Sequence, residues 1–217
     1  GFCVVLARTN KAVPPQRGIT AFVVDRGTAG FSASKKLEKY GCRSSDTVEL
    51  TFDNVRVPDD SRVGAVDQGF YDTMKILDRG RISIASMALG LGRGALGAAL
   101  EYAKDRRAFG KAIAEFQAIQ WKLADSQTEL DAAELLIRRA AWLCDLGRPY
   151  APEAAMAKLF ASEAATRACN EALQIHGGYG YTREFDVERH LRDVKLCEIG
   201  EGTSEVQRMV IAKNMLR

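Results

Sequence analysis

The hydrophobic pattern of this 217-residue chain changes its period once, near residue 60, and this change limits the folds open to it. Before residue 60, three short runs separated by polar turns are typical of strands: Phe2–Ala7, Ile19–Val24 and Thr47–Phe52. From about Asp67 onward, apolar residues recur every three or four positions, as in amphipathic helices. The sequence therefore predicts an α+β fold, with a partial antiparallel β-domain followed by an all-α four-helix-type bundle.

Connections that contain Gly or Pro divide the second part into helices. We expect helices over about residues 70–106, 113–146, 152–177, 187–197 and 204–216. Long helices with short connections favour an antiparallel bundle. We place the β-domain at residues 1–62 and the bundle at residues 63–217. Because three strands make a thin sheet, we expect upstream residues or another chain to complete it.

Charge and composition argue against several classes of function. The formal net charge is +3 and no long run of Lys or Arg is present, so we expect no nucleic-acid partner. No uninterrupted apolar segment predicts a membrane span. The five cysteines are scattered without zinc-site spacing, which favours a reducing compartment. With only two histidines in the chain, we expect no metal site.

One carboxylate stands between two glycines, at Gly200-Glu201-Gly202, just before a predicted helix. Ser204 and Gln207 have the spacing of a capping box, which predicts a helix start there, and Thr203 is an equally good candidate for the N-cap. Glycines at a turn let the backbone approach a ligand closely, because they have no side chain. The residues alone leave two interpretations open: Glu201 complements the helix macrodipole, or it serves a ligand site.

Three further segments have ordinary structural explanations when each is taken alone. The basic segment Asp105–Lys111 follows a helix end, where positive charge complements the dipole. The adjacent glycines of Gln174–Gly178 are typical of a helix C-cap. The mixed charges of Asp78–Arg81 are typical of a solvated helix face.

Together these segments resemble the acyl-CoA dehydrogenase family. Glu198–Gln207 is similar to the family's C-terminal signature, Arg106–Gly110 to its Arg-x-x-Phe-Gly motif, and Gln174–Gly178 to its glycine-rich motif. The resemblance covers essentially all of the chain. It implies FAD-dependent α,β-dehydrogenation of an acyl-CoA thioester, as in fatty-acid β-oxidation and amino-acid catabolism. It also implies that the family's N-terminal helical domain and early β-strands lie outside this sequence, which leaves open whether this chain alone binds FAD or is active.

The resemblance also implies roles for particular residues. The glutamate of the Glu-Gly-Thr-Ser motif is the family's α-proton-abstracting base, which implies that role for Glu201, with hydride transfer to the flavin. Some members carry their glutamate at the position of Gly80, where glycine cannot act as a base. The implied acyl-CoA contacts are Asp78, Arg81, Gly200 and Gly202. The implied FAD contacts are Arg106, Phe109, Gln117, Gln174, Gly177, Gly178, Thr203 and Glu205.

The implied partners and substrate follow from the same resemblance. Some branched-chain members share the glycine of position 200, so we expect a short or branched acyl-CoA. We also expect electron-transfer flavoprotein as the acceptor, and a homodimer or homotetramer in which Arg106 reaches FAD across the interface. The compartment would be the bacterial cytoplasm or the mitochondrial matrix. Two alternatives stay open: a non-catalytic helical oligomerisation fragment without bound FAD, and a flavin oxidase of the same fold.

Overall fold

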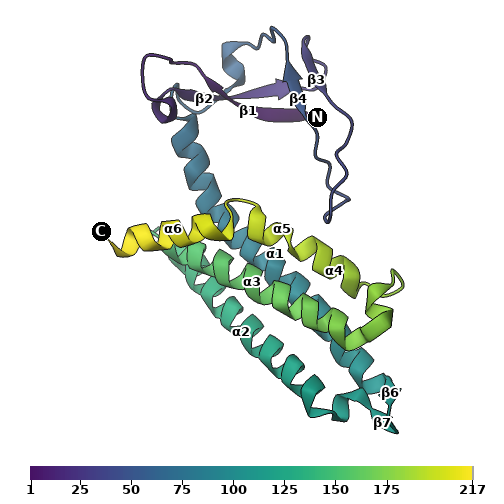
Figure 1. Ribbon diagram of the computed structural model, residues 1–217. Helices are drawn as coiled ribbons and strands as arrows, with labels where there is room; N and C mark the ends of the chain where they lie inside the picture. The colour runs from purple at the N-terminus through teal and green to yellow at the C-terminus, as the bar shows by residue number, and fades with distance from the viewer. Residues whose placement is uncertain (217) are drawn as a thin grey trace. The chain divides into compact units, whose positions relative to one another are not determined.

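The computed structural model describes residues 1–216, and the chain divides into two compact units (Figure 1). The first unit comprises residues 1–39 and 43–77, and the second comprises residues 40–42 and the chain from Asp78 onward. The first unit holds antiparallel strands and the second is helical, apart from one short hairpin. The predicted α+β fold class is therefore confirmed.

The first unit contains two small antiparallel sheets. One has the order β1 (Phe2–Arg8), β2 (Ile19–Asp25), β5 (Arg62–Val63). The other pairs β3 (Phe31–Ala33) with β4 (Leu50–Phe52). Burial alternates along β1 because successive side chains of a strand point to opposite faces, and Phe2 and Val4 on the outer face are 69% and 57% exposed. The strand expected at Thr47–Phe52 is limited to Leu50–Phe52.

The second unit is a bundle of long helices, with three shorter helices packed against α3 (Figure 1). The long helices are α1 (Gly69–Asp105), which belongs to this unit from Asp78 onward, α2 (Gln117–Asp145) and α3 (Ala151–His176). The short ones are α4 (Val187–Val194), α5 (Leu196–Ile199) and α6 (Ser204–Met215). A hairpin of β6 (Arg107–Ala108) and β7 (Lys111–Ala112) joins α1 to α2. The expected helices are confirmed, and the one expected over 187–197 divides into α4 and α5.

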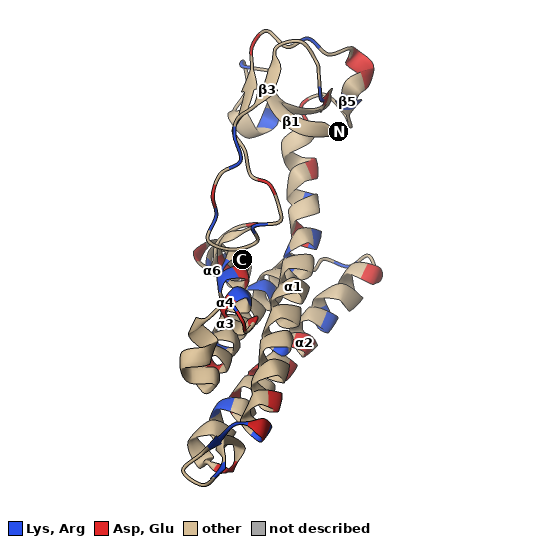
Figure 2. Ribbon diagram, turned by 90° about the vertical axis from the view of Figure 1, so that its right-hand side faces the viewer, with Lys and Arg blue, Asp and Glu red and all other residues tan. Residues whose placement is uncertain are grey.

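Small residues let these helices approach closely. The core is rich in fully buried alanines, with members from α1, α2 and α3: Ala85, Ala88, Ala95, Ala99, Ala133, Ala140, Ala157, Ala161 and Ala165. Leu130 of α2 fills the space beside Gly92 of α1, where an added Cβ would lie 2.7 Å from its Cδ2. Charged residues lie along the helices, as Figure 2 shows. This alanine core fixes the helices that carry the candidate site.

Helix α1 is the one helix among residues 1–216 that is long and apolar enough to cross a membrane, by length and composition alone. The mean hydropathy of its most apolar window is 1.3, and 39% of that window is buried in the fold. Fully buried alanines of α1 belong to the core of the bundle. These observations identify α1 as a core helix, and a membrane span is not supported.

Candidate active site

A strained turn between α5 and α6 carries Glu201. Gly200 is extended, Glu201 has φ +52° and Gly202 has φ +94°. Positive φ is costly for a residue with a Cβ, about 1–2 kcal/mol in the left-handed region. Glu201 therefore adopts this conformation only because its surroundings hold it there.

The helix after this turn starts at the first of its two candidate N-caps. Thr203, not Ser204, is the N-cap of α6, and its hydroxyl accepts a hydrogen bond from the Val206 N–H at 3.4 Å. The capping box predicted for Ser204 and Gln207 is wrong. The buried Ser204 hydroxyl has no protein partner within residues 1–216, and Gln207 turns back toward the Glu201 turn.

Two buried side chains hold the carbonyl of Gly202. Lys158 of α3 donates from Nζ to this oxygen at 2.8 Å, and Gln207 of α6 donates from Nε2 to it, also at 2.8 Å. Both side chains are fully buried, and burial lowers the pKa of the Lys158 ammonium. The sequence predicted no role for Lys158, and for Gln207 it predicted only the capping box. The available signal was a lysine on the apolar face of α3, among Ala154, Ala157 and Ala161.

The Glu201 carboxylate lies against α1 at Gly80. A Cβ built on Gly80 would lie 1.9 Å from Oε2 and 2.7 Å from Oε1 of Glu201. Oε2 is buried and has no hydrogen-bond partner within residues 1–216. The backbone N–H of Glu201 likewise has no acceptor in that range. A buried carboxylate oxygen without a hydrogen-bond partner is uncommon in proteins and marks Glu201 as a candidate functional group.

An ion pair lies on α1 next to this position. The Arg81 guanidinium donates from Nη1 to Asp78 Oδ1 at 2.6 Å, and Arg81 is only 8% exposed. Burial raises the pKa of the Asp78 carboxyl, while the Arg81 charge acts in the opposite direction. The Nε atom of Arg81 is buried and has no partner within residues 1–216. The structure thus brings Asp78 and Arg81 to the same stretch of helix as Gly80.

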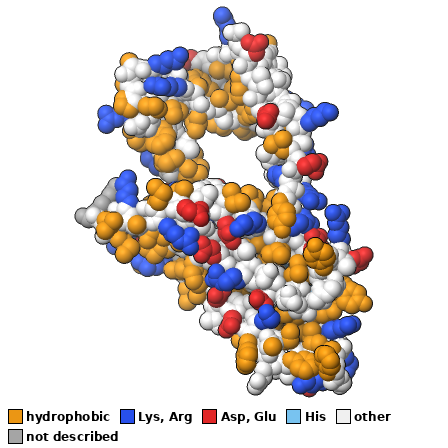
Figure 3. All heavy atoms as spheres, viewed as in Figure 1, with side chains coloured by type: hydrophobic (Ala, Val, Ile, Leu, Met, Phe, Trp, Pro, Cys, Tyr) orange, Lys and Arg blue, Asp and Glu red, His pale blue; other side chains and the backbone are white. Residues whose placement is uncertain are grey.

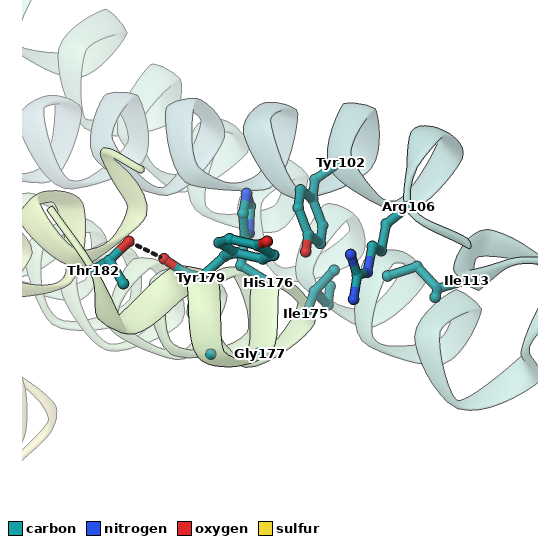
Figure 4. Close-up of a pocket in the computed structure, with 9 residues that line it drawn as sticks. Tyr102, Arg106, Ile113, Ile175, His176, Gly177, Tyr179 and Thr182 are labelled. Atoms are coloured by element: carbon teal, nitrogen blue, oxygen red, sulfur yellow. Dashed lines mark hydrogen bonds between the residues drawn. The ribbon is translucent and has the colours of Figure 1, made fainter. Parts of the chain in front are cut away.

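A second cluster surrounds a cavity of about 470 Å³ at the other end of α1, drawn in Figure 4. The Arg106 guanidinium lies 5.6 Å from the centre of the Tyr179 ring, and Gly177 and Gly178 line the same cavity. Gly177 has φ +58°, which favours glycine. A guanidinium beside open glycine backbone is a donor set that fits an anionic phosphate group.

The remaining residues predicted for the cofactor do not line this cavity. Phe109 is 95% exposed on the β6–β7 turn, and Gln117 and Gln174 are exposed on α2 and α3. His176, for which we predicted no catalytic role, is buried, with its ring stacked on Tyr102 at 4.2 Å between centres. Its Nδ1 lies 2.8 Å from the Ala172 carbonyl.

The two clusters are far apart along one helix. The Glu201 carboxylate lies against Gly80, and Tyr102 lines the Arg106 cavity. Gly80 and Tyr102 both belong to α1. The 22 residues that separate positions 80 and 102 span about 33 Å at 1.5 Å per residue. The clusters are therefore separate parts of the helical unit. Within residues 1–216, no group of His, Cys, Asp and Glu could hold a metal ion.

The fold is thus an alanine-rich helical bundle that carries a strained glutamate turn against one place on α1 and a basic, glycine-lined cavity at another. The chain belongs to the acyl-CoA dehydrogenase family: residues 67–216 match the family model described as acyl-CoA dehydrogenase, C-terminal domain.

Three relatives support the assignment over nearly the whole chain. The chain is 51% identical to the probable acyl-CoA dehydrogenase YngJ of Bacillus subtilis, over 99% of this chain and 56% of that protein. It is 50% identical to the human mitochondrial short-chain specific acyl-CoA dehydrogenase, over 99% of this chain and 52% of that protein. The solved structure of butyryl-CoA dehydrogenase from Megasphaera elsdenii superposes with a TM-score of 0.96 at 45% identity, over 100% of this chain and 56% of that one. The chain thus spans about half the length of the curated relatives it matches.

Two other similar proteins carry a partner or a cofactor in their names. One is the caffeyl-CoA reductase–Etf complex subunit CarC of Acetobacterium woodii, 45% identical over 99% of this chain and 56% of that protein. The other is a solved structure described as PigA with FAD and proline, 28% identical with a TM-score of 0.93, over 98% of this chain and 55% of that one.

Proposed function

We propose that the protein containing this chain is an FAD-dependent dehydrogenase that forms an α,β double bond in a short or branched acyl-CoA. The observation that carries the proposal is the Glu201 carboxylate, held in a strained turn against Gly80 with Oε2 buried and unpaired within residues 1–216. A carboxylate kept free of hydrogen-bond donors is available to accept a proton from a bound substrate.

Glu201 would contribute twice to the reaction. Its carboxylate would take the proton from the α-carbon of the thioester. Its backbone N–H, without an acceptor in residues 1–216, would donate to the thioester carbonyl, where negative charge develops. Gly80 offers no competing base on the facing helix. FAD, when bound, would accept the hydride that leaves the β-carbon.

The basic cavity would hold the pyrophosphate of FAD. Arg106 would pair with the phosphate oxygens through its planar fork, and Gly177 and Gly178 would let the backbone approach. Because this cavity lies about 33 Å along α1 from Gly80, we propose that it serves the FAD of a second copy. Phe109, Gln117 and Gln174 would join that contact, and Thr203 and Glu205 would contact the flavin beside Glu201.

A homodimer or homotetramer would place the two half-sites together. Helix α2 presents large apolar side chains to the outside, with Trp121, Leu135 and Trp142 exposed by 63%, 69% and 57%. Hydrophobic side chains also reach the surface on the face shown in Figure 3. Exposed apolar residues of this size are typical of a surface that another chain covers.

The substrate proposal rests on the residues around Glu201. Asp78 and Arg81 would line the acyl-CoA site together with Gly200 and Gly202. The position of Gly200 is close to Leu196: an added Cβ would lie 3.3 Å from the carbonyl oxygen of Leu196, a tight contact, and 3.7 Å from the Cδ1 atom of Leu196. A tyrosine there would fill space that a branched acyl chain uses. We therefore expect Gly200→Tyr to lower kcat/KM more for isobutyryl-CoA than for butyryl-CoA, and equal losses would remove this part of the proposal.

The electron acceptor and the compartment are proposed from the relatives. CarC is named as a subunit of a complex with Etf, which supports an electron-transfer flavoprotein as the partner. The protein would act in the cytoplasm of a bacterium or in the mitochondrial matrix of a eukaryote.

The test compares two glutamates of the same segment. Turnover of butyryl-CoA is measured with a dye acceptor, using the FAD-loaded full-length polypeptide that carries this sequence. Glu201→Gln should lower kcat by roughly 10²–10⁴-fold and leave FAD bound. The control is Glu198→Gln, because the Glu198 carboxylate pairs with Lys195 instead of facing Gly80. Wild-type turnover in Glu201→Gln would contradict the proposal.

A further inference from the structure

Lys158 is buried at a place where an ion is costly. Its side chain is fully buried in α3, and no carboxylate of residues 1–216 lies within 4.0 Å of Nζ. Among residues 1–216, the one hydrogen-bond acceptor of the ammonium is the Gly202 carbonyl, at 2.8 Å. An apolar side chain of similar size at this position would avoid the desolvation cost. A lysine kept there needs a reason other than stability.

The charges around Lys158 come from several elements. Cys197 and Glu198 of α5 and Glu205 of α6 favour its charged form, and Arg81 of α1 disfavours it. The buried ammonium therefore donates its hydrogen bond to a neutral backbone carbonyl, while groups of both signs act on its charge. Gln207 of α6 donates to the same oxygen from Nε2. Two donors thus fix one carbonyl, which belongs to the residue directly after Glu201.

This carbonyl controls the conformation of the turn. The peptide group after Gly202 joins the turn to α6, and its orientation sets ψ of Gly202 and φ of Thr203, so that a rotation of this group would move the turn relative to α6. Two hydrogen bonds to the Gly202 oxygen prevent that rotation. The two bonds therefore help to hold Glu201 in the left-handed region, which costs free energy for a residue with a Cβ.

We propose that Lys158 is a positioning residue which, together with Gln207, holds the Gly202 carbonyl and so keeps the Glu201 carboxylate against Gly80 in its reactive place. This inference rests on the proposed function of Glu201 as the base. Lys158 itself touches neither substrate nor cofactor in this role.

The test isolates proton removal from oxidation. The probe is tert-butylacetyl-CoA, which has α-hydrogens but no β-hydrogen, so that it can exchange its α-protons with deuterium oxide but cannot be oxidised. Exchange is followed by NMR on the FAD-loaded full-length protein. We expect Lys158→Met to slow exchange at saturating probe by about 10- to 100-fold, because misplacing a base by about 1 Å costs up to that factor. FAD content and the Kd of the probe should change by less than about twofold, because the residues that bind FAD and the probe are unchanged.

Matched variants separate positioning from stability. Ser162→Ala changes a fully buried side chain one turn along α3, whose hydroxyl bonds only to the Leu159 carbonyl, and it should exchange at the wild-type rate. Gln207→Leu removes the second donor to the same carbonyl and should slow exchange like Lys158→Met. It also tests the proposal if Lys158→Met does not fold.

Two outcomes would overturn the inference, and they differ. Wild-type exchange in both Lys158→Met and Gln207→Leu, with Glu201→Gln inactive, overturns the positioning role and leaves the proposed function standing. Undiminished exchange in Glu201→Gln overturns the proposed function, and the role of Lys158 with it.

Discussion

The Glu201 carboxylate occupies the space that a side chain at position 80 would fill. A Cβ on Gly80 would lie 1.9 Å from Glu201 Oε2 and 2.5 Å from its Cδ, far inside any permitted contact. The two residues come from α1 and from the α5–α6 turn, 121 positions apart in the chain. The place of the carboxylate therefore depends on the absence of a side chain on the facing helix.

Gly80→Ala should separate activity from stability. Alanine is a better helix former than glycine by about 1 kcal/mol, so that the free energy of unfolding should not fall. The methyl group would displace the carboxylate, and kcat should drop at least about tenfold. The control is Gly90→Ala in the same helix, where an added Cβ meets nothing within 4 Å and activity should be unchanged. Urea unfolding and steady-state turnover check both effects, and full activity in Gly80→Ala would contradict the steric relationship.

Glu201→Gly should relieve strain while removing the base. Glycine adopts positive φ freely, but it also loses more backbone entropy on folding, so we expect a net gain of about 0.5–1 kcal/mol in the free energy of unfolding. Glu201→Gln keeps the Cβ and should match the wild type. Gly202→Ala should destabilise, because its φ is +94° and the added Cβ would lie 2.9 Å from Gln207 Nε2. Chemical denaturation of the variants measures the order of stability, and a destabilised Glu201→Gly would show that the turn is not strained.

Arg106→Lys should weaken FAD binding. Lysine keeps the charge but loses the paired donors that fit a phosphate, which should raise the Kd of FAD by about tenfold or more. Arg107 is the matched control, because it is exposed on β6 and does not line the cavity. Titration of the apoprotein with FAD measures both variants. Equal affinities for the two variants would show that the cavity does not hold the cofactor.

His190 should make stability depend on pH below about 6.5. Burial, followed by the Arg189 charge, lowers the pKa of the His190 imidazole in the folded protein. The unfolded chain then binds a proton more readily, so this contribution to stability is complete above the unfolded pKa of about 6.5 and is lost as pH falls through the folded pKa. His190→Gln should show a flatter decline of Tm between about pH 6.5 and 5 than the wild type. An identical decline would assign the pH dependence to other groups.

Periodicity and turn chemistry were enough to predict the helices from the sequence. The helix expected over 152–177 is α3 (Ala151–His176), because its alanine face repeats every three or four residues and glycine follows its end. The short strands β3, β5, β6 and β7 were missed, since two or three residues carry no readable period. Strand pairing at that length is decided by tertiary contacts.

The sequence predicted only part of the candidate site, again because some contacts leave no local pattern. The Gly-Glu-Gly segment and Arg106 stood out because they belong to motifs. Lys158 and Gln207 serve the site through one backbone carbonyl, and such a contact leaves no pattern at short sequence spacing. The capping role predicted for Gln207 was also wrong, because its side chain donates to the Gly202 carbonyl across the turn and not to the start of the helix.

The most direct test of the central claim, that Glu201 removes the α-proton, is one anaerobic mixing experiment. FAD-loaded full-length protein is mixed with butyryl-CoA, and the visible flavin band is followed in the wild type and in Glu201→Gln. We expect the wild type to bleach within the time of a turnover and Glu201→Gln to bleach roughly 10²–10⁴-fold more slowly with its flavin still bound. Equal bleaching rates in the two proteins would contradict the claim.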